Sequence, residues 1–108
     1  MPGGTALAAT SGARMDALLF SFVRLLSTLD SYRRYLTSTD RKAIEKELAG
    51  LSQELAHGDE SGKVREVKQR RVEILGKRLE RFDRAAESRE LISHQLASID
   101  DFMRLLHE

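Results

Sequence analysis

The stretch that decides the fold is residues 63–107, which read KVREVKQRRVEILGKRLERFDRAAESRELISHQLASIDDFMRLLH. Good helix formers dominate it, proline is absent, and Gly76 is its only glycine. Apolar residues recur three and four positions apart, which is the period of an amphipathic helix. One helix over 63–107 is therefore predicted, with a length of roughly 65–70 Å from the rise per residue.

The apolar residues of this long helix form a stripe, which we call the seam of the helix. Its predicted members are Val64, Val67, Val72, Leu75, Leu79, Phe82, Ala86, Ile92, Leu96, Ile99, Met103 and Leu106. The regular spacing is lost between Ala86 and Ile92. Such a slip predicts either a local change of supercoiling or a change of the helix that packs on the seam.

Two shorter helices are predicted before the long one, over residues 14–37 and 40–57. The first has an apolar seam formed by Met15, Leu18, Leu19, Phe22, Leu25, Leu26, Leu29, Tyr32 and Leu36. Phe20 and Val23 add a second apolar side to it, so more than one face needs to be covered. The second helix has a narrow seam of coiled-coil spacing formed by Ile44, Leu48, Leu51 and Leu55.

Two junctions separate the predicted helices. Residues 37–40, Thr-Ser-Thr-Asp, are N-cap residue types without Gly or Pro. A turn with a capped restart of the helix, a shallow kink and a nearly continuous helix are therefore all compatible with them. Residues 57–62 contain two glycines and give the strongest turn signal in the chain. There, Gly58 can adopt the left-handed conformation after a helix, and Asp59 or Ser61 can cap the next one.

These elements predict an all-α fold, and the two shorter helices together match the length of the long helix. The expected architecture is a long helical hairpin or coiled coil, with the shorter helices packed antiparallel on the long one. Residues 1–13 are uncharged and rich in Gly, Ala, Ser and Thr, which predicts a flexible or tag-like leader before a single helical domain over 14–108. No Gly or Pro ends the helix before Glu108, which favours a fragment of a longer protein.

No pattern of catalytic or metal-binding residues is expected to operate in this chain. Cysteine is absent, which excludes thiolate metal sites and fits a reducing, cytoplasmic environment. One acidic stripe with a histidine exists on the long helix, but it lies opposite the seam and so faces solvent: Asp83, Glu87, Glu90 and His94. We therefore predict a protein that is not an enzyme and that has no cofactor, metal or catalytic residue.

The basic stretch 63–84 is the main candidate for binding a polyanion. It carries nine basic and four acidic side chains, whereas residues 85–108 carry two basic and five acidic ones. The candidate contacts to phosphates share one side of the helix: Arg70, Lys77, Arg81 and Arg84. Glutamates four residues before three of these, at 66, 73 and 80, favour instead a solvated face stabilised by ion pairs.

The predicted function is therefore a non-catalytic module for oligomerisation and protein interaction, a scaffold that forms a dimeric helical bundle and also binds another protein. Apolar seam residues are the predicted interface: Leu18, Leu19, Phe22, Leu26, Leu48, Leu55, Leu75, Phe82, Leu96 and Ile99. The alternative is binding to nucleic acid or an anionic membrane surface through the basic stretch 63–84 or the apolar helix 15–29.

Overall fold

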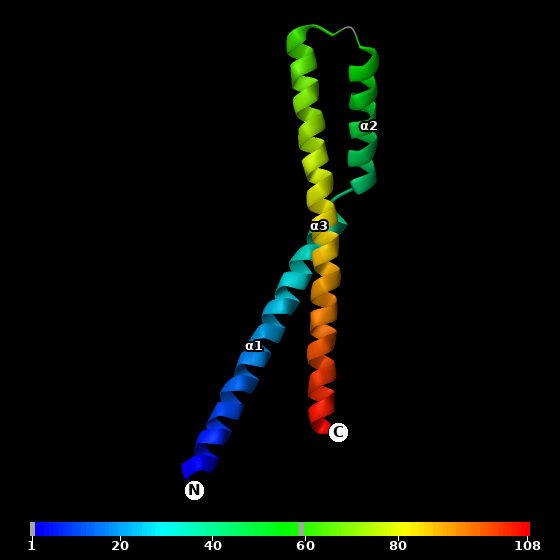
Figure 1. The fold of residues 1–108 in the computed structure, drawn as a ribbon. Helices are drawn as coiled ribbons and strands as arrows, with labels where there is room; N and C mark the ends of the chain where they lie inside the picture. Colours follow the sequence, from blue (N-terminus) through cyan, green and yellow to red (C-terminus); the bar gives the residue numbers. More distant parts are fainter. Residues whose placement is uncertain (1, 59) are drawn as a thin grey trace. The chain divides into compact units, whose positions relative to one another are not determined.

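The structure is a computed structural model that describes the backbone of residues 2–58 and 60–108, and the side chains of residues 12–58 and 60–108. These ranges fold into helices α1 (Pro2–Ser38), α2 (Arg41–His57) and α3 (Gly62–His107), shown in Figure 1. No β-strand occurs in the described ranges. The predicted all-α fold is confirmed, and α3 continues through Gly76 as one helix.

The first helix begins at Pro2, well before the predicted start at residue 14. Proline is tolerated in the first turn of a helix, because the N–H that it lacks would have no partner there. A flexible leader over residues 1–13 stays a prediction, since Met1 and the side chains of residues 2–11 lie outside what the structure describes.

The junction before α2 is a capped restart of the helix, one of the alternatives that the sequence leaves open. Asp40 is extended, with φ −92° and ψ 94°, and its carboxylate accepts a hydrogen bond from the Ala43 N–H at 3.1 Å. The Asp40 carbonyl accepts the first helical bond, from the Ile44 N–H at 3.2 Å. Asp40 is thus the N-cap of α2, and its carboxylate satisfies one of the N–H groups that a helix start leaves without a partner.

The chain divides into two compact units. Unit 1 combines α1 up to Arg33 with α3 from Arg89, and unit 2 comprises Arg34–Ser88. The boundary on α3 lies within the interval 86–92, where the seam changes phase. Helix α3 packs on α2 in unit 2 and on α1 in unit 1, so the change of packing partner accounts for the slip.

Unit 2 is a helical hairpin in which α2 lies antiparallel beside the first half of α3 (Figure 1). Ile44 and Leu51 of α2 and Leu75 of α3 are buried together. Leu48, Val72 and Leu79 pack against them. This core confirms the seam predicted for α2 and the central part of the seam predicted for α3.

The start of the α3 seam differs from the prediction. Val64 and Val67 are exposed, and Lys68 occupies the position next to Val72 in the seam. Lysine can fill such a position because its alkyl chain packs against apolar neighbours while its ammonium reaches polar partners. The prediction was wrong here because it chose seam residues by their apolar type alone, which favoured the two valines over Lys68.

Unit 1 buries one residue of each helix most deeply, Leu29 of α1 and Ile92 of α3. The flanking seam residues are half-buried: Met15, Leu18, Phe22, Leu25, Tyr32, Leu96, Ile99 and Met103. Leu106 was predicted in the seam, but it is exposed. At the slip in unit 2, Ala85 is buried more deeply than the predicted Ala86, because the seam advances there by three residues instead of four.

Candidate functional site

The most extensive exposed apolar surface on α1 is adjacent to its seam. Leu19 is 47% exposed, Phe20 66%, Val23 63% and Leu26 44%, and all four lie within about two helical turns. Leu19, Val23 and Leu26 each come one residue after a seam residue. Their side chains therefore form a second stripe, about 100° around the helix from the seam. We call Leu19, Phe20, Val23 and Leu26 the outer face of α1.

The structure separates the predicted interface residues into three groups. Leu75 is buried in the core of unit 2. The half-buried seam residues are Leu18, Phe22, Leu48, Leu55, Phe82, Leu96 and Ile99. Leu19 and Leu26 are exposed on the outer face, where Phe20 and Val23 join them. Phe20 and Val23 were absent from the predicted interface, although their position on a second apolar side was visible in the sequence.

Helix α3 also exposes apolar side chains in each unit. In unit 1 these are Leu91, Phe102, Leu105 and Leu106, and in unit 2 they are Val64, Val67 and Ile74. In unit 1, Phe102, Leu105 and Leu106 lie within about one turn, and Leu91 lies about three turns before them. The outer face of α1 is thus a cluster of four exposed apolar side chains, and the end of α3 carries a second cluster of three.

Ion pairs link α2 to α3 on both sides of the unit 2 core. Arg41 Nε donates to Asp83 Oδ1 at 2.9 Å, and its Nη2 donates to Asp83 Oδ2 at 3.1 Å. Arg71 Nη2 donates to Glu47 Oε1 at 2.5 Å. The Arg41 guanidinium holds the pKa of Asp83 below its ordinary value of 3.8 through these hydrogen bonds. These ion pairs join α2 and α3 in the antiparallel register of the hairpin.

The turn end of the hairpin is organised around Lys68, whose side chain is 21% exposed. Its ammonium donates to the carboxylate of Glu60 and lies 3.3 Å from Glu54 Oε2. The hydrogen bond from Lys68 is the main cause that lowers the pKa of Glu60 below 4.5, and partial burial opposes it. Arg65 adds a hydrogen bond to the Leu55 carbonyl at 3.2 Å, which also joins the two helices.

These ion pairs predict a loss of stability in acid. The pKa values of Glu60 and Asp83 are lower in the folded chain, so their stabilisation is present above pH 4.5 and is lost as the pH falls through the folded values. We expect the urea midpoint to fall between about pH 5 and pH 3. Lys68→Met should reduce this fall, because Glu60 then loses the group that lowers its pKa.

The matched control is Lys77→Met, which removes an exposed lysine 3.4 Å from Glu73 on the same helix. Its urea midpoint should fall with pH as in the unmodified chain. Equal pH profiles for the Lys68 and Lys77 variants would show that the turn end contributes nothing to acid sensitivity.

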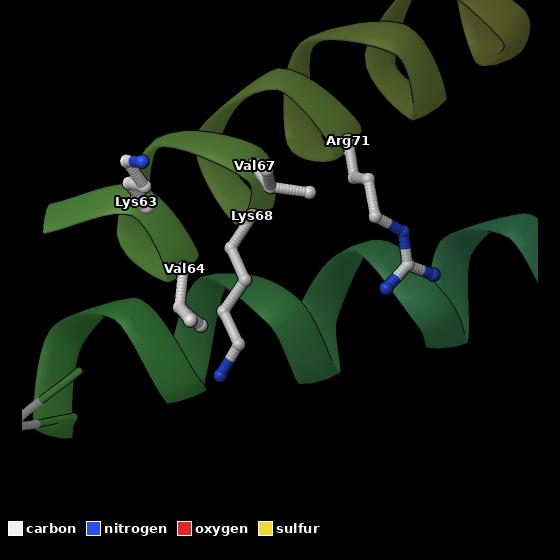
Figure 2. Close-up of a pocket in the computed structure, with 5 residues that line it drawn as sticks. All are labelled: Lys63, Val64, Val67, Lys68 and Arg71. Carbon is white, nitrogen blue, oxygen red and sulfur yellow. The ribbon is translucent and has the colours of Figure 1, made fainter. Parts of the chain in front are cut away.

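A shallow groove of about 400 Å³ lies on α3 beside these ion pairs, lined by Lys63, Val64, Val67, Lys68 and Arg71. Figure 2 shows Lys68 and Arg71 extending from α3 towards α2. Their cationic groups contact Glu60, Glu54 and Glu47. The rim of the groove is therefore largely neutralised, which weakens its attraction for an anionic ligand.

The predicted polyanion contacts are also engaged within the chain. Arg70 lies 3.9 Å from Glu66, Lys77 lies 3.4 Å from Glu73, and Arg84 lies 3.9 Å from Glu80. All three i, i+4 pairs suggested by the sequence are thus present. The guanidinium of Arg81 lies over the Tyr35 ring, 5.7 Å from its centroid. Polyanion binding through these residues stays a prediction, and the ion pairs favour a solvated face.

The acidic stripe of α3 forms two isolated contacts. His94 Nε2 lies 3.7 Å from Glu90 Oε2 on the exposed side of the helix, and Asp83 pairs instead with Arg41. Within the described ranges, no group of three or more His, Cys, Asp or Glu side chains is placed to hold a metal ion. Over the same residues, no helix combines the length and apolar character needed to cross a membrane.

Comparisons with protein-family models, with curated proteins and with solved structures found no match to this chain.

Proposed function

We propose that this chain is a non-catalytic helical oligomerisation module that self-associates through the outer face of α1. The observation that supports this proposal is the exposure of Leu19, Phe20, Val23 and Leu26 within about two turns. Contiguous exposed apolar side chains of this kind mark protein contacts, because leaving them in water is unfavourable.

The pattern of α1 also supports a four-helix bundle made of two copies. A helix of a bundle contacts two neighbours, so it carries two adjacent apolar stripes. The seam of α1 packs within its own unit around Leu29, and the outer face is left for a helix of another molecule. The additional protein partner expected from the sequence has no assigned surface and stays a prediction.

The double variant Phe20→Ser/Val23→Ser tests the proposal in the full chain. We expect light scattering to give a dimer for the unmodified protein at both low and high salt, because apolar burial is insensitive to screening. The variant should shift the chain to a monomer over the same concentration range. Circular dichroism should show unchanged helix content, since both substituted side chains are exposed.

A matched control is Val67→Ser/Ile74→Ser, which replaces two β-branched side chains that are 55% and 51% exposed in unit 2. This control should keep the mass of the unmodified protein. A monomeric unmodified chain, or a control that dissociates as fully as the Phe20/Val23 variant, would contradict the proposal.

A further inference from the structure

Three residues of the outer face of α1, Leu19, Val23 and Leu26, belong to a longer stripe that begins and ends with charged residues. Its exposed members are Asp16, Leu19, Val23, Leu26, Asp30 and Arg33. Successive members are separated by three, four, three, four and three positions, which is the spacing of a coiled-coil seam. The stripe is thus a second seam with apolar residues in its middle and opposite charges at its ends.

Two of the charged members, Asp16 and Arg33, form no ion pair within the part of the chain that the structure describes, although Asp30 lies one turn before Arg33 on the same stripe. Among the described residues, no hydrogen bond or ion pair involves the Asp16 or Arg33 side chain, and both side chains are exposed. Asp30, between them, already interacts within the chain. Asp16 and Arg33 are therefore the charges of the stripe that are available to another molecule.

From this distribution we infer that the outer face of α1 packs against α1 of a second copy running in the opposite direction. The inference rests on the proposed self-association and adds its orientation and register. Asp16 of each copy lies beside Arg33 of the other, and Val23 lies beside Leu26 across a two-fold axis. The two central layers are then filled by Val23 and Leu26 from both copies, Leu19 of each copy lies beside Asp30 of the other, and the two end layers pair opposite charges.

A parallel arrangement places identical residues opposite each other in every layer. Asp16 then meets Asp16, Asp30 meets Asp30 and Arg33 meets Arg33, so every charged layer is repulsive. Repulsive layers select against an orientation even where apolar contacts are similar. The charges at the ends of the stripe therefore favour the antiparallel orientation.

Charge reversal in the full chain tests the inference. Asp16→Arg and Arg33→Asp each place like charges together twice per dimer, so each variant should raise the dissociation constant of the dimer roughly tenfold at low ionic strength. The double variant Asp16→Arg/Arg33→Asp restores opposite charges in both end layers. Its dissociation constant should return to within about threefold of the original, which sedimentation equilibrium can measure.

Engineered disulfides provide a second readout that does not depend on small energies. The chain contains no cysteine, so single cysteines can be introduced at Asp16 or Arg33 without competing thiols. An oxidised mixture of Asp16→Cys and Arg33→Cys chains should form a disulfide between the two variants. Each variant alone should not cross-link within the dimer, because identical positions lie roughly 25 Å apart in the antiparallel arrangement.

The possible results separate this inference from the proposed function. Rescue by the double reversal together with mixed cross-links supports both. Dissociation by Phe20→Ser/Val23→Ser, combined with no rescue and with cross-links between identical positions, retains self-association and overturns the antiparallel orientation. A monomeric unmodified chain overturns both.

Discussion

Replacing Leu75 by Ala is expected to lower the free energy of unfolding by about 2–5 kcal/mol. Leu75 is 5% exposed and lies in the core of unit 2 with Ile44 and Leu51. Truncation removes apolar contacts and leaves a cavity between the two helices of the hairpin. The hairpin has few other buried residues to compensate for the loss, so the effect should be among the largest of any single substitution.

The control for this variant is Ile74→Ala, one position earlier on the same helix. Ile74 is 51% exposed, so its truncation should cost less than about 1 kcal/mol. Urea denaturation followed by circular dichroism measures both, at a protein concentration held constant to fix any oligomerisation. Equal losses at the two positions would contradict the assignment of the core.

The core of unit 2 could be predicted from the sequence because only one apolar stripe exists on α2. The spacing of Ile44, Leu48 and Leu51 admits one buried face, and α3 offers Leu75 and Leu79 to match it. The start of the α3 seam could not be predicted in the same way. Burial of Lys68 depends on carboxylates contributed by α2 and by the turn, which the periodicity of α3 does not reveal.

The outer face of α1 was only partly predictable for a different reason. Leu18 and Leu19, like Leu25 and Leu26, are adjacent apolar residues that lie about 100° apart on the helix. Either member of each pair can belong to the buried stripe, and the sequence alone assigned both members of the first pair to the interface. The burial of Leu29 shows which member of each pair is buried, because Leu18 and Leu25 share the stripe of Leu29 and Leu19 and Leu26 do not.

Replacing Gly58 by Ala is the second substitution expected to have a large effect. Gly58 follows α2 with φ −86° and ψ 147°, so the left-handed conformation expected from the sequence is wrong. Its requirement for glycine is steric instead. A Cβ at this position would lie 2.5 Å from the Glu54 carbonyl oxygen and would collide with the carboxylate of Glu60. Relieving these contacts displaces the turn backbone, and we expect a loss of about 1–3 kcal/mol.

Gly50→Ala is a control that predicts the opposite sign. Gly50 lies inside α2 with open space around the position of an added Cβ. Alanine there should raise the free energy of unfolding by about 0.5–1 kcal/mol, since it lowers the conformational entropy of the unfolded chain. Urea denaturation of both variants tests the pair. Stabilisation by Gly58→Ala would mean that the Glu60 carboxylate moves away freely and that its contact with Lys68 does not hold the turn. A loss of stability in the Gly50 variant as well would contradict the steric argument, because open space surrounds an added Cβ at Gly50.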